Sequence, residues 1–416
     1  MNILQVADGN VRIPPSRGGG TESYILGISK SLAKLGNRVV LLDRKYTPAD
    51  PRVEHVDQVI IARLESPRLG SKRLLHGPNI FIINLGYLVN VFLYAIRVKS
   101  WIKCNPEFDI INVHDIMIGL ALVLAGVKNR IVYTQHGLSY ERRISEPTTL
   151  VYSTLRGFLV QRVSAVVALN PVSMLRLSQE IRGRGTLVGT IPVGVDIDNF
   201  GKSRNRRDDV ALKYDLQGRI ILSVGRISKE KGTEVLVRAA DVLFSSGQFP
   251  DVSIAIVGPI SRFGIFGQST PYFRHLVAIT SSLRLYKKVR FLGNLSRDDL
   301  LGLYSGCKVF VLPSMKENFS QALVEAMAAG KPVVASKLPG TVSQVKDGWN
   351  GFLVSPGNEF SLAERITWLL KHDEEAQAMG SNGRKLAEEK FSDDSVARSL
   401  EVLYSRCLGR SGPFAS

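Results

Sequence analysis

Two glutamates, Glu317 and Glu325, are the side chains best placed for chemistry in the stretch Leu312–Ser336. Glu317 lies in a short polar segment before a run of good helix formers, which places Glu325 about two turns further on. The N-terminus of such a helix offers unpaired N–H groups and a positive dipole end, which suit a phosphate group. Carboxylates accept hydrogen bonds from vicinal hydroxyls, so a nucleotide sugar would find both kinds of partner here. The alternative is a pair of ordinary surface acids, and the flanking residues decide between the two.

Two cations, Arg226 and Lys231, form a second candidate group in the segment Ser223–Gly232. A predicted strand ends at Gly225, so both cations should lie near the N-terminus of the next helix. Arginine can hold phosphate oxygens through two parallel hydrogen bonds, and lysine acts as a point charge. Taken in isolation, a solvated basic loop is the simpler interpretation.

Glycines and a histidine follow two further predicted strands. Gly19 and Gly20 come after the first strand and directly before a helical pattern, where glycine lets the backbone approach an anion closely. A flexible loop is the more common explanation of such a turn. His136 follows the fifth predicted strand, at the sheet edge where ligands bind, although a lone histidine is more often structural.

Apolar runs rich in Val, Ile and Leu alternate with helical patterns along the whole chain. In the first half, the predicted strands are Ile3–Ala7, Arg38–Asp43, Val59–Leu64, Asp109–Val113, Arg130–Tyr133 and Ala165–Leu169. In the second half, they are Ile220–Val224, Val252–Val257, Val289–Leu292, Lys308–Leu312, Pro332–Ala335 and Gly351–Val354. Continuous apolar runs between helices predict parallel sheets covered on both faces. The chain is therefore predicted to form two doubly wound, Rossmann-like α/β domains, with ligands at the carboxyl ends of the strands.

The residues around the two glutamates resemble the signature of the retaining GT-B glycosyltransferases of family 4. The matching residues are Pro313, Ser314, Glu317, Phe319, Glu325–Ala328, Gly330 and Pro332–Ser336. Four other segments resemble motifs of that family in the same order along the chain: Gly19-Gly20, Thr134–Gly137, Ile191–Asp196 and Ser223–Gly232. The resemblance thus covers nearly the whole chain.

This resemblance implies a role for each candidate residue in binding a nucleotide sugar. It implies that Glu325 binds the ribose hydroxyls and that Glu317 faces the donor sugar. Arg226 and Lys231 would neutralise the diphosphate leaving group, so that no metal ion or other cofactor is expected.

The glycines and the histidine receive roles from the same resemblance. Gly19 and Gly20 would border the donor phosphates and the acceptor, and His136 would lie at the sugar site. Glu317 and His136 are therefore the catalytic candidates. Ser320 stands where the family usually has glycine, and its side chain would lie against the donor sugar or diphosphate.

The resemblance also implies the domain organisation of the GT-B fold, in which two domains face a cleft. We expect an N-terminal acceptor-side domain over residues 1–197, a linker over 198–210 and a nucleotide-sugar-binding domain over 211–392. The final segment, 393–416, is expected to hold a helix that returns to the first domain.

Two other features need an interpretation. Asp196-Ile197-Asp198 spells the D-x-D metal motif of the other major glycosyltransferase fold, but two paired domains do not fit that single-domain architecture. The loop Gly258–Arg274 contains Phe263, Phe266 and Tyr272, which would either stack on a base or acceptor or simply pack.

Charge and cysteine content limit the setting of the protein. Net charge is +17, and residues 1–195 carry 24 basic and 13 acidic side chains, so the first half holds most of the excess. Such a surface attracts an anionic membrane or nucleic acid, or reflects a basic background. Three widely spaced cysteines fit no disulfide framework, which favours a reducing cytoplasm. We expect no signal peptide, because Met1 leads directly into a predicted strand.

The apolar run Ile80–Ile96 has no charged residue and is flanked by basic residues on both sides. A membrane-spanning helix needs about 20 apolar residues, and a span at this position would separate strands of one predicted sheet. A helix packed in the first domain is the default interpretation. A helix face that touches anionic lipid comes second.

These observations together predict a retaining hexosyltransferase that uses a UDP-, GDP- or ADP-sugar. The expected acceptor is a glycan or a lipid-linked saccharide, in the assembly of surface polysaccharide, lipopolysaccharide or glycolipid. The alternatives are a nucleotide-sugar epimerase of the same fold and a basic α/β protein that binds nucleic acid or membrane. Against nucleic acid, the sequence contains no RNA-binding motif and no interleaving of aromatic and basic residues.

Overall fold

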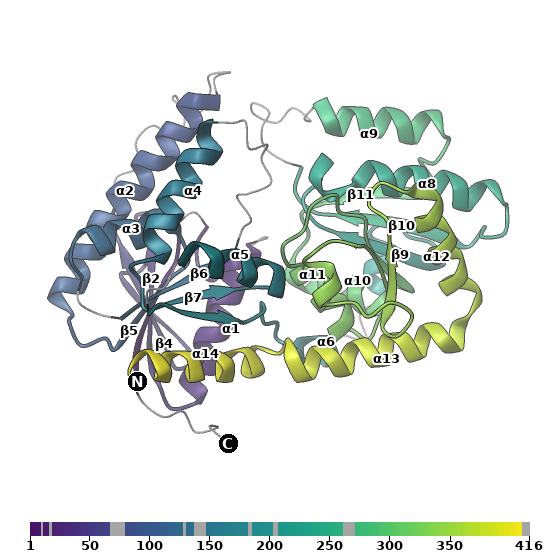
Figure 1. Ribbon diagram of the computed structural model, residues 1–416. Helices are drawn as coiled ribbons and strands as arrows, with labels where there is room; N and C mark the ends of the chain where they lie inside the picture. Colours follow the sequence, from purple (N-terminus) through teal and green to yellow (C-terminus); the bar gives the residue numbers. More distant parts are fainter. Residues whose placement is uncertain are drawn as a thin grey trace. The chain divides into compact units, whose positions relative to one another are not determined.

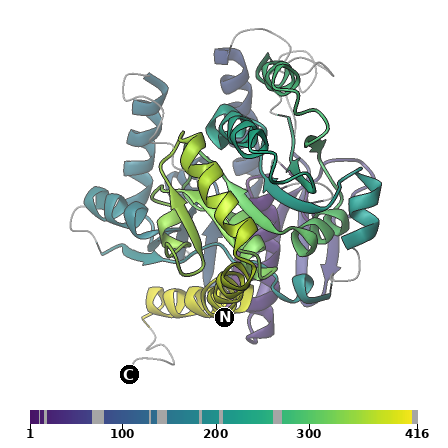
Figure 2. The ribbon, with the colours of Figure 1, turned by 90° about the vertical axis from the view of Figure 1, so that its right-hand side faces the viewer.

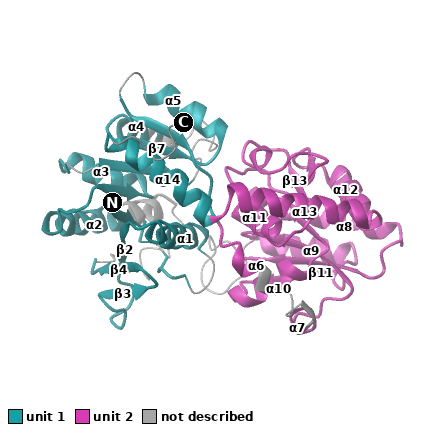
Figure 3. Cartoon of the chain, turned by 90° about the horizontal axis from the view of Figure 1, so that it is seen from below, with its two compact units in different colours: residues 1–15, 19–194, 393–416 teal, residues 16–18, 195–392 magenta. Residues whose placement is uncertain are grey.

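A computed structural model describes most of the chain as two compact units (Figure 3). The described residues are 1–9, 11–15, 19–66, 80–127, 130–136, 147–181, 185–202, 207–260 and 271–409. Unit 1 comprises residues 1–15, 19–194 and 393–416, and unit 2 comprises residues 16–18 and 195–392. Each unit is an α/β layer structure with its own sheet.

Unit 1 is built on an eight-stranded sheet with the order β3-β4-β2-β1-β5-β6-β7-β8. Its strands are β1 (Asn2–Val6), β2 (Arg38–Arg44), β3 (Val53–Val56), β4 (Val59–Leu64), β5 (Ile110–Val113), β6 (Arg130–Gln135), β7 (Ala165–Ala168) and β8 (Leu187–Thr190). All neighbours are parallel except β3 and β4. Leu4 of the central strand β1 lies opposite Val40 on one side and Ile111 on the other. The order reverses between β1 and β5, so the ligand crevice of this sheet is expected at their carboxyl ends.

Six α-helices cover this sheet in the described residues of unit 1 (Figure 1). They are α1 (Gly20–Lys34), α2 (Ile80–Cys104), α3 (Ile116–Leu124), α4 (Pro147–Val160), α5 (Pro171–Ile181) and α14 (Asp393–Cys407). Helix α14 comes from the far end of the sequence and packs beside α1. Ser31 donates a hydrogen bond to Asp394 at 2.6 Å, and Asn37 donates one to Glu401 at 2.7 Å. These bonds hold the last helix on the first unit.

Unit 2 is built on a six-stranded, entirely parallel sheet with the order β11-β10-β9-β12-β13-β14. Its strands are β9 (Arg219–Val224), β10 (Val252–Val257), β11 (Val289–Gly293), β12 (Val309–Leu312), β13 (Val333–Ser336) and β14 (Gly351–Val354). Phe310 of β12 lies opposite Leu222 of β9 and Val333 of β13. The order reverses between β9 and β12, which again marks the expected ligand crevice.

Helices cover both faces of the second sheet. They are α6 (Asp198–Lys202), α7 (Arg207–Lys213), α8 (Thr233–Ser245), α9 (Pro271–Ser282), α10 (Arg297–Gly306), α11 (Gln321–Ala328), α12 (Glu359–Lys371) and α13 (Asp373–Lys390), with short 3₁₀ turns η4 (Lys229–Lys231) and η5 (Thr341–Ser343). Helices α8 and α12 pack together over one face (Figure 2). Helices α10 and α11 contribute to the core on the other face. The strands between them are buried on both sides, as parallel strands in such layers must be.

The prediction of two doubly wound parallel sheets is confirmed, and every predicted strand is present. The sequence reasoning missed only β3 and β8. The polar tract 198–210, predicted as a linker, holds α6 and the beginning of α7, and Phe200 of α6 is buried against Tyr304.

Two segments, Ile80–Ile96 and Gly258–Arg274, had more than one interpretation in the sequence, and the structure decides only part of each. Helix α2 extends beyond the apolar run, to Cys104, and its second half packs into the core of unit 1. Of the described residues, no helix is long and apolar enough to cross a membrane. Phe263 and Phe266 lie outside the described residues. Tyr272 lies in the first turn of α9, and its hydroxyl accepts a hydrogen bond from the backbone N–H of Glu234 at 3.2 Å, so this ring packs on α8.

Candidate functional site

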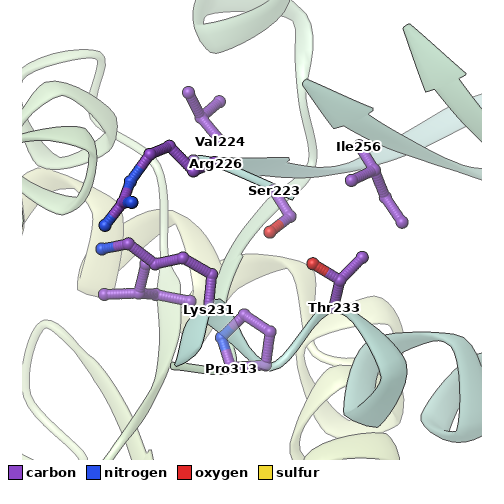
Figure 4. A pocket seen from close by; sticks show the side chains of 9 residues that line it. Ser223, Val224, Arg226, Lys231, Thr233, Ile256 and Pro313 are labelled. Atoms are coloured by element: carbon purple, nitrogen blue, oxygen red, sulfur yellow. The ribbon is translucent and has the colours of Figure 1, made fainter. Parts of the chain in front are cut away.

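A pocket lies at the carboxyl ends of β9, β10 and β12 in unit 2, at the point where the strand order reverses (Figure 4). Arg226 and Lys231 line it, and both long side chains extend to the same side in Figure 4. The hydroxyls of Ser223 and Thr233 face one another in that view. The pocket therefore combines two cations with two hydroxyl groups at the expected ligand crevice.

Two glycines let the backbone segments around this pocket pack directly on one another. A Cβ at Gly232 would lie 1.8 Å from the carbonyl oxygen of Pro313, and the φ angle is +65°. A Cβ at Gly258 would lie 2.0 Å from the carbonyl oxygen of Gly225, with φ at +142°. No other residue fits either position, because the obstacle is backbone and the conformation is left-handed. The first approach brings the loop after β12 against the end of η4, and the second brings the end of β10 against the end of β9.

The loop contact brings Lys231 and Glu317 together, although they are far apart in the sequence. Lys231 Nζ lies 2.6 Å from Glu317 Oε2, and the side chains are 23% and 8% exposed. The hydroxyl of Ser314, which is fully buried, donates to the same oxygen at 3.3 Å. Within the described residues, Glu317 Oε1 makes no hydrogen bond. One oxygen of Glu317 is thus fixed, and the other remains as an acceptor.

Arg226 is placed differently from Lys231. Its side chain is 57% exposed, and its nearest acid, Glu230, lies 3.9 Å away and is itself exposed. A pair so open to solvent contributes little to stability. Arg226 is therefore available to an anion in the pocket without a large rearrangement.

Glu325 lies on the buried face of α11 and is not among the residues that line this pocket. It is 5% exposed, and its Oε1 accepts a hydrogen bond from Arg297 at 2.7 Å. The Arg297 guanidinium also lies over the ring of Phe200, 5.5 Å from the centroid. Sequence reasoning missed Arg297, which reads only as the start of a helix. Glu317 and Glu325 thus have different cationic partners.

Ser320 caps helix α11. Its hydroxyl accepts a hydrogen bond from the backbone N–H of Leu323 at 3.2 Å, and its own N–H donates to the side chain of Gln344 at 3.1 Å. The residue is 4% exposed. The Ser320 side chain, which was expected to lie against the donor, therefore caps the N-terminus of α11, a position where serine is favoured.

Gly19 and Gly20 form the start of α1 in unit 1, at the carboxyl end of β1. Gly19 has φ +85° and precedes the helix without a side-chain cap. A Cβ there would lie 2.9 Å from Glu22 Oε2. Glu22 is itself buried, and burial, with the nearby carboxylate of Asp8, raises its pKa to about 7. This turn therefore combines a glycine backbone with a carboxyl group that titrates near neutrality.

His136 directly follows β6 in unit 1 and pairs with a second histidine that the sequence reasoning missed. Its Nε2 lies 2.8 Å from Nδ1 of His114, which directly follows β5. The ring of Tyr24, on α1, meets His136 edge to face at 5.3 Å, so α1 and the ends of β5 and β6 come together. Burial lowers the pKa of His136 to about 4. Burial, and then the neighbouring His136, lower the pKa of His114 well below its usual value.

No group of three or more His, Cys, Asp or Glu side chains in the described residues could hold a metal ion. The two oxygens of Asp196, in the D-x-D segment, accept hydrogen bonds from the backbone and side chain of Asn199. The expectation that the reaction needs no metal stays a prediction.

Comparisons with known proteins identify the family that the chain resembles. Residues 205–386 match the family "Glycosyl transferases group 1", and residues 18–199 match "Glycosyltransferase Family 4". A D-inositol 3-phosphate glycosyltransferase of Corynebacterium diphtheriae is 26% identical over 93% of this chain and 89% of that protein. The capsular polysaccharide biosynthesis glycosyltransferase CapM of Staphylococcus aureus is 28% identical, but the match spans only 52% of this chain and 54% of that relative.

Solved structures share the fold over almost the whole chain. A sucrose-phosphate synthase from Thermosynechococcus elongatus superposes with a TM-score of 0.78 at 22% identity, covering 98% of this chain and 100% of that one. Anabaena Alr3699/HepE in complex with UDP-glucose superposes with a TM-score of 0.72 at 21% identity, with the same coverage. These similarities confirm the GT-B fold.

Proposed function

The chain belongs to the group 1, family 4 glycosyltransferases, and from that premise we propose that it moves a hexose from a nucleotide sugar to an acceptor hydroxyl with retention of anomeric configuration. In this reaction the bond between the anomeric carbon and the diphosphate breaks, and a bond from that carbon to the acceptor oxygen forms. The sugar passes through an oxocarbenium-like state while charge grows on the diphosphate. The protein must therefore stabilise an anion and hold a sugar in one place.

The proposed donor site uses the strand-end residues of unit 2. Lys231 and Arg226 would neutralise the diphosphate as it leaves, because preorganised cations stabilise charge that develops in a transition state. Glu317 would accept hydrogen bonds from hydroxyls of the transferred sugar, through the oxygen that Lys231 and Ser314 leave unused. Glu325 would accept the ribose hydroxyls, with Arg297 holding its carboxylate.

Unit 1 would supply the remaining groups of the proposed site. Gly19 and Gly20 would border the donor phosphates and the acceptor at the N-terminus of α1, where backbone N–H groups suit an anion. His136 would contact the donor sugar. The observation that carries the proposal is the pairing of Lys231 with Glu317 at 2.6 Å in the crevice of the sheet, because it places a phosphate-type and a hydroxyl-type partner side by side.

Binding and slow hydrolysis of UDP-, GDP- and ADP-sugars would test the proposal. UDP-glucose is the first probe, since Anabaena HepE was solved with it. We expect one nucleotide sugar to bind the wild type, to bind Glu325→Ala far more weakly, and to be unaffected by a chelator. Glu364→Ala, which removes an exposed glutamate of α12, is the matched control and should bind like the wild type. Absence of binding to every nucleotide sugar would overturn the proposal, and loss of binding with chelator would overturn its metal-free form.

We also propose that the acceptor is a glycan or a lipid-linked saccharide used in surface polysaccharide or glycolipid assembly. The CapM relative supports this by its role in capsular polysaccharide biosynthesis. The D-inositol 3-phosphate relatives point to a small phosphorylated acceptor instead. Transfer of radiolabelled sugar to a panel containing inositol phosphate and lipid-linked saccharides would separate the two, and transfer to inositol phosphate alone would overturn the polysaccharide role.

A cytoplasmic location at the inner membrane surface is the remaining part of the proposal. On helix α2, Phe92 is 54% exposed and Ile96 is 43% exposed, and the basic residues Arg97 and Lys103 are exposed beside them. Apolar side chains next to cations suit an anionic bilayer surface.

Vesicle sedimentation would test this contact at low salt. The wild type should bind vesicles of anionic lipid and not neutral vesicles, and Phe92→Ser with Ile96→Ser should abolish the binding. Leu212→Ser, which removes an 84% exposed leucine of α7 in unit 2, is the matched control. Equal partition of the wild type between buffer and anionic vesicles would contradict membrane contact.

A further inference from the structure

The loop that carries Glu317 lies against the turn after β13, and one buried side chain joins the two. The loop comprises residues 317–320, between β12 and α11, and the turn comprises residues 338–344, which include η5. Gln344 ends this turn and is fully buried. Its side chain reaches the backbone of the loop.

Gln344 binds the backbone of Ser320 through both ends of its amide group. Its Oε1 accepts a hydrogen bond from the Ser320 N–H at 3.1 Å, and its Nε2 donates to the Ser320 carbonyl oxygen at 2.8 Å. These partners fix the orientation of the amide, because a backbone N–H can only donate and a carbonyl oxygen can only accept. A carboxylate at this position would offer acceptors alone, and an aliphatic side chain would offer neither group.

The same turn also contacts the other end of the loop, at Glu317. The N–H of Gly340 donates to the carbonyl oxygen of Glu317 at 3.3 Å. A Cβ at Gly340 would lie 2.4 Å from the carbonyl oxygen of Asn318 and 2.7 Å from that of Glu317, so backbone packs directly on backbone. The loop is thus bound to the turn at its first and its last residue.

Buried side chains hold the turn in place. Asn350 is fully buried, and its Nδ2 donates to the carbonyl oxygen of Gln344 at 3.1 Å while its Oδ1 accepts from the N–H of Lys346 at 2.8 Å. The hydroxyl of Thr341, which is also fully buried, accepts from the N–H of Leu338 at 2.9 Å. Buried polar groups that are paired in this way make a rigid support.

We propose that Gln344 is a positioning residue for the transferred sugar. By holding Ser320, it keeps the 317–320 loop on the turn, and so it sets the position of the Glu317 oxygen that receives a sugar hydroxyl. This inference rests on the proposed function, because it needs a sugar at Glu317. Gln344 itself does not touch the substrate.

The inference predicts a loss of affinity for the sugar and not for the nucleotide. Lys231 and Ser314 bind one oxygen of Glu317, so the backbone of the loop determines where the other oxygen points. Arg226 and Lys231, which would hold the diphosphate, lie in the segment between β9 and α8 and not in this loop. Kd for UDP should therefore depend little on Gln344.

Binding of UDP-glucose and of UDP to full-length Gln344→Met is the first test. This change keeps the approximate size of the side chain and removes both hydrogen bonds to Ser320. We expect Kd for UDP-glucose to rise about tenfold and Kd for UDP to stay within about twofold, because a buried N–H loses its partner in the loop alone. If the wild type binds a different nucleotide sugar, that sugar and its nucleoside diphosphate are the probes.

Gln344→Glu tests whether the donor to the Ser320 carbonyl is what matters. At about pH 8 its ionised carboxylate faces that carbonyl oxygen without a proton, and Kd for UDP-glucose should rise as in Gln344→Met. At about pH 5 a buried carboxyl group is protonated and regains a donor, so Kd for UDP-glucose should return to within about twofold of the wild type at the same pH.

Asn358→Ala is the matched control. Asn358 Oδ1 accepts a hydrogen bond from the N–H of Ser361 at 2.9 Å and caps α12, so this change also removes a bond between a side chain and the backbone of unit 2. It lowers stability through loss of the cap and should leave Kd for UDP-glucose and for UDP within about twofold of the wild type.

The outcomes separate the inference from the function on which it rests. If the wild type binds no nucleotide sugar, the proposed function fails and the inference fails with it. If the wild type binds and Gln344→Met weakens UDP and UDP-glucose equally, Gln344 has only a structural role and the inference alone is overturned. Failure of Gln344→Glu to recover at low pH would overturn it as well, and this variant decides the question if Gln344→Met does not fold.

Discussion

Replacement of Glu317 by Gln should increase affinity for the nucleoside diphosphate while decreasing affinity for the sugar. The change keeps the shape of the side chain and removes its charge. In the structure, Lys231 Nζ lies 2.6 Å from Glu317 Oε2, so a diphosphate must compete with Glu317 for this cation. With Gln at 317, Lys231 has no anionic partner among the described residues, and the diphosphate no longer has to displace one.

The size of the gain follows from the burial of the pair. At an effective dielectric constant of about 20, two charges at this distance attract by several kcal/mol before desolvation is subtracted. Lys231 is 23% exposed, so solvent screens much of that attraction. We expect a net effect of about 1 kcal/mol, which is about a fivefold lower Kd for UDP. The same change removes the ionised acceptor for the sugar, so Kd for UDP-glucose should rise and turnover should fall.

Isothermal titration of UDP and UDP-glucose measures both effects in one experiment. Glu230→Gln is the matched control, because it removes an equal charge from a 62% exposed residue on the same turn. It should change Kd for UDP by less than about twofold, since exposed charges are well screened. If Glu317→Gln binds UDP no more tightly than the wild type, or if the control tightens binding equally, the reasoning from the ion pair is refuted.

Three further predictions concern stability. Gly232→Ala should lower the free energy of unfolding in urea by ~3 kcal/mol or more, because its Cβ would meet a backbone carbonyl at 1.8 Å. Gly247→Ala, with φ +66° and no atom within 4 Å, should lower it by only ~1 kcal/mol, and similar values for the two variants would contradict the close packing. Ser320→Ala should cost ~1 kcal/mol through loss of the helix cap, and Ser320→Gly only a few tenths; an increase in activity for both would show that this side chain obstructs the donor. The pKa of Glu22 is raised from 4.5 to about 7 in the folded protein, so its contribution is complete below pH 4.5 and is lost as pH rises through 7. Between pH 5 and 8, the free energy of unfolding from urea titrations should therefore fall more steeply for the wild type than for Glu22→Gln, by ~3 kcal/mol at most. Parallel curves would refute the shifted pKa.

The strands could be predicted because their composition reflects burial on both faces. Val252–Val257 is buried at every position, and an uninterrupted apolar run follows from that. The missed strands are exceptions of a single kind. β3 is an edge strand with a half-exposed Val-Glu-His-Val pattern, and β8 is an edge strand whose residues are half-buried at most. Neither has the composition that marks a central strand.

The candidate residues of the site could be predicted singly, but not their partners. The pairs Lys231–Glu317 and Arg297–Glu325 join segments that meet only through the sheet order, which a local pattern does not contain. His114 was accessible to the same reasoning as His136, since it also directly follows a predicted strand. It was missed because no motif drew attention to it.

The position of α14 has a consequence for how the protein is made. Unit 1 begins at the first residue, yet its last helix is synthesised only after the whole of unit 2. Tyr404 and the hydrogen bonds to Ser31 and Asn37 are missing until then. Domains usually fold in the order in which they leave the ribosome. Here the second unit can be complete while the first still lacks its last helix, so the face of α1 that holds Gly27 and Ser31 stays uncovered until synthesis ends.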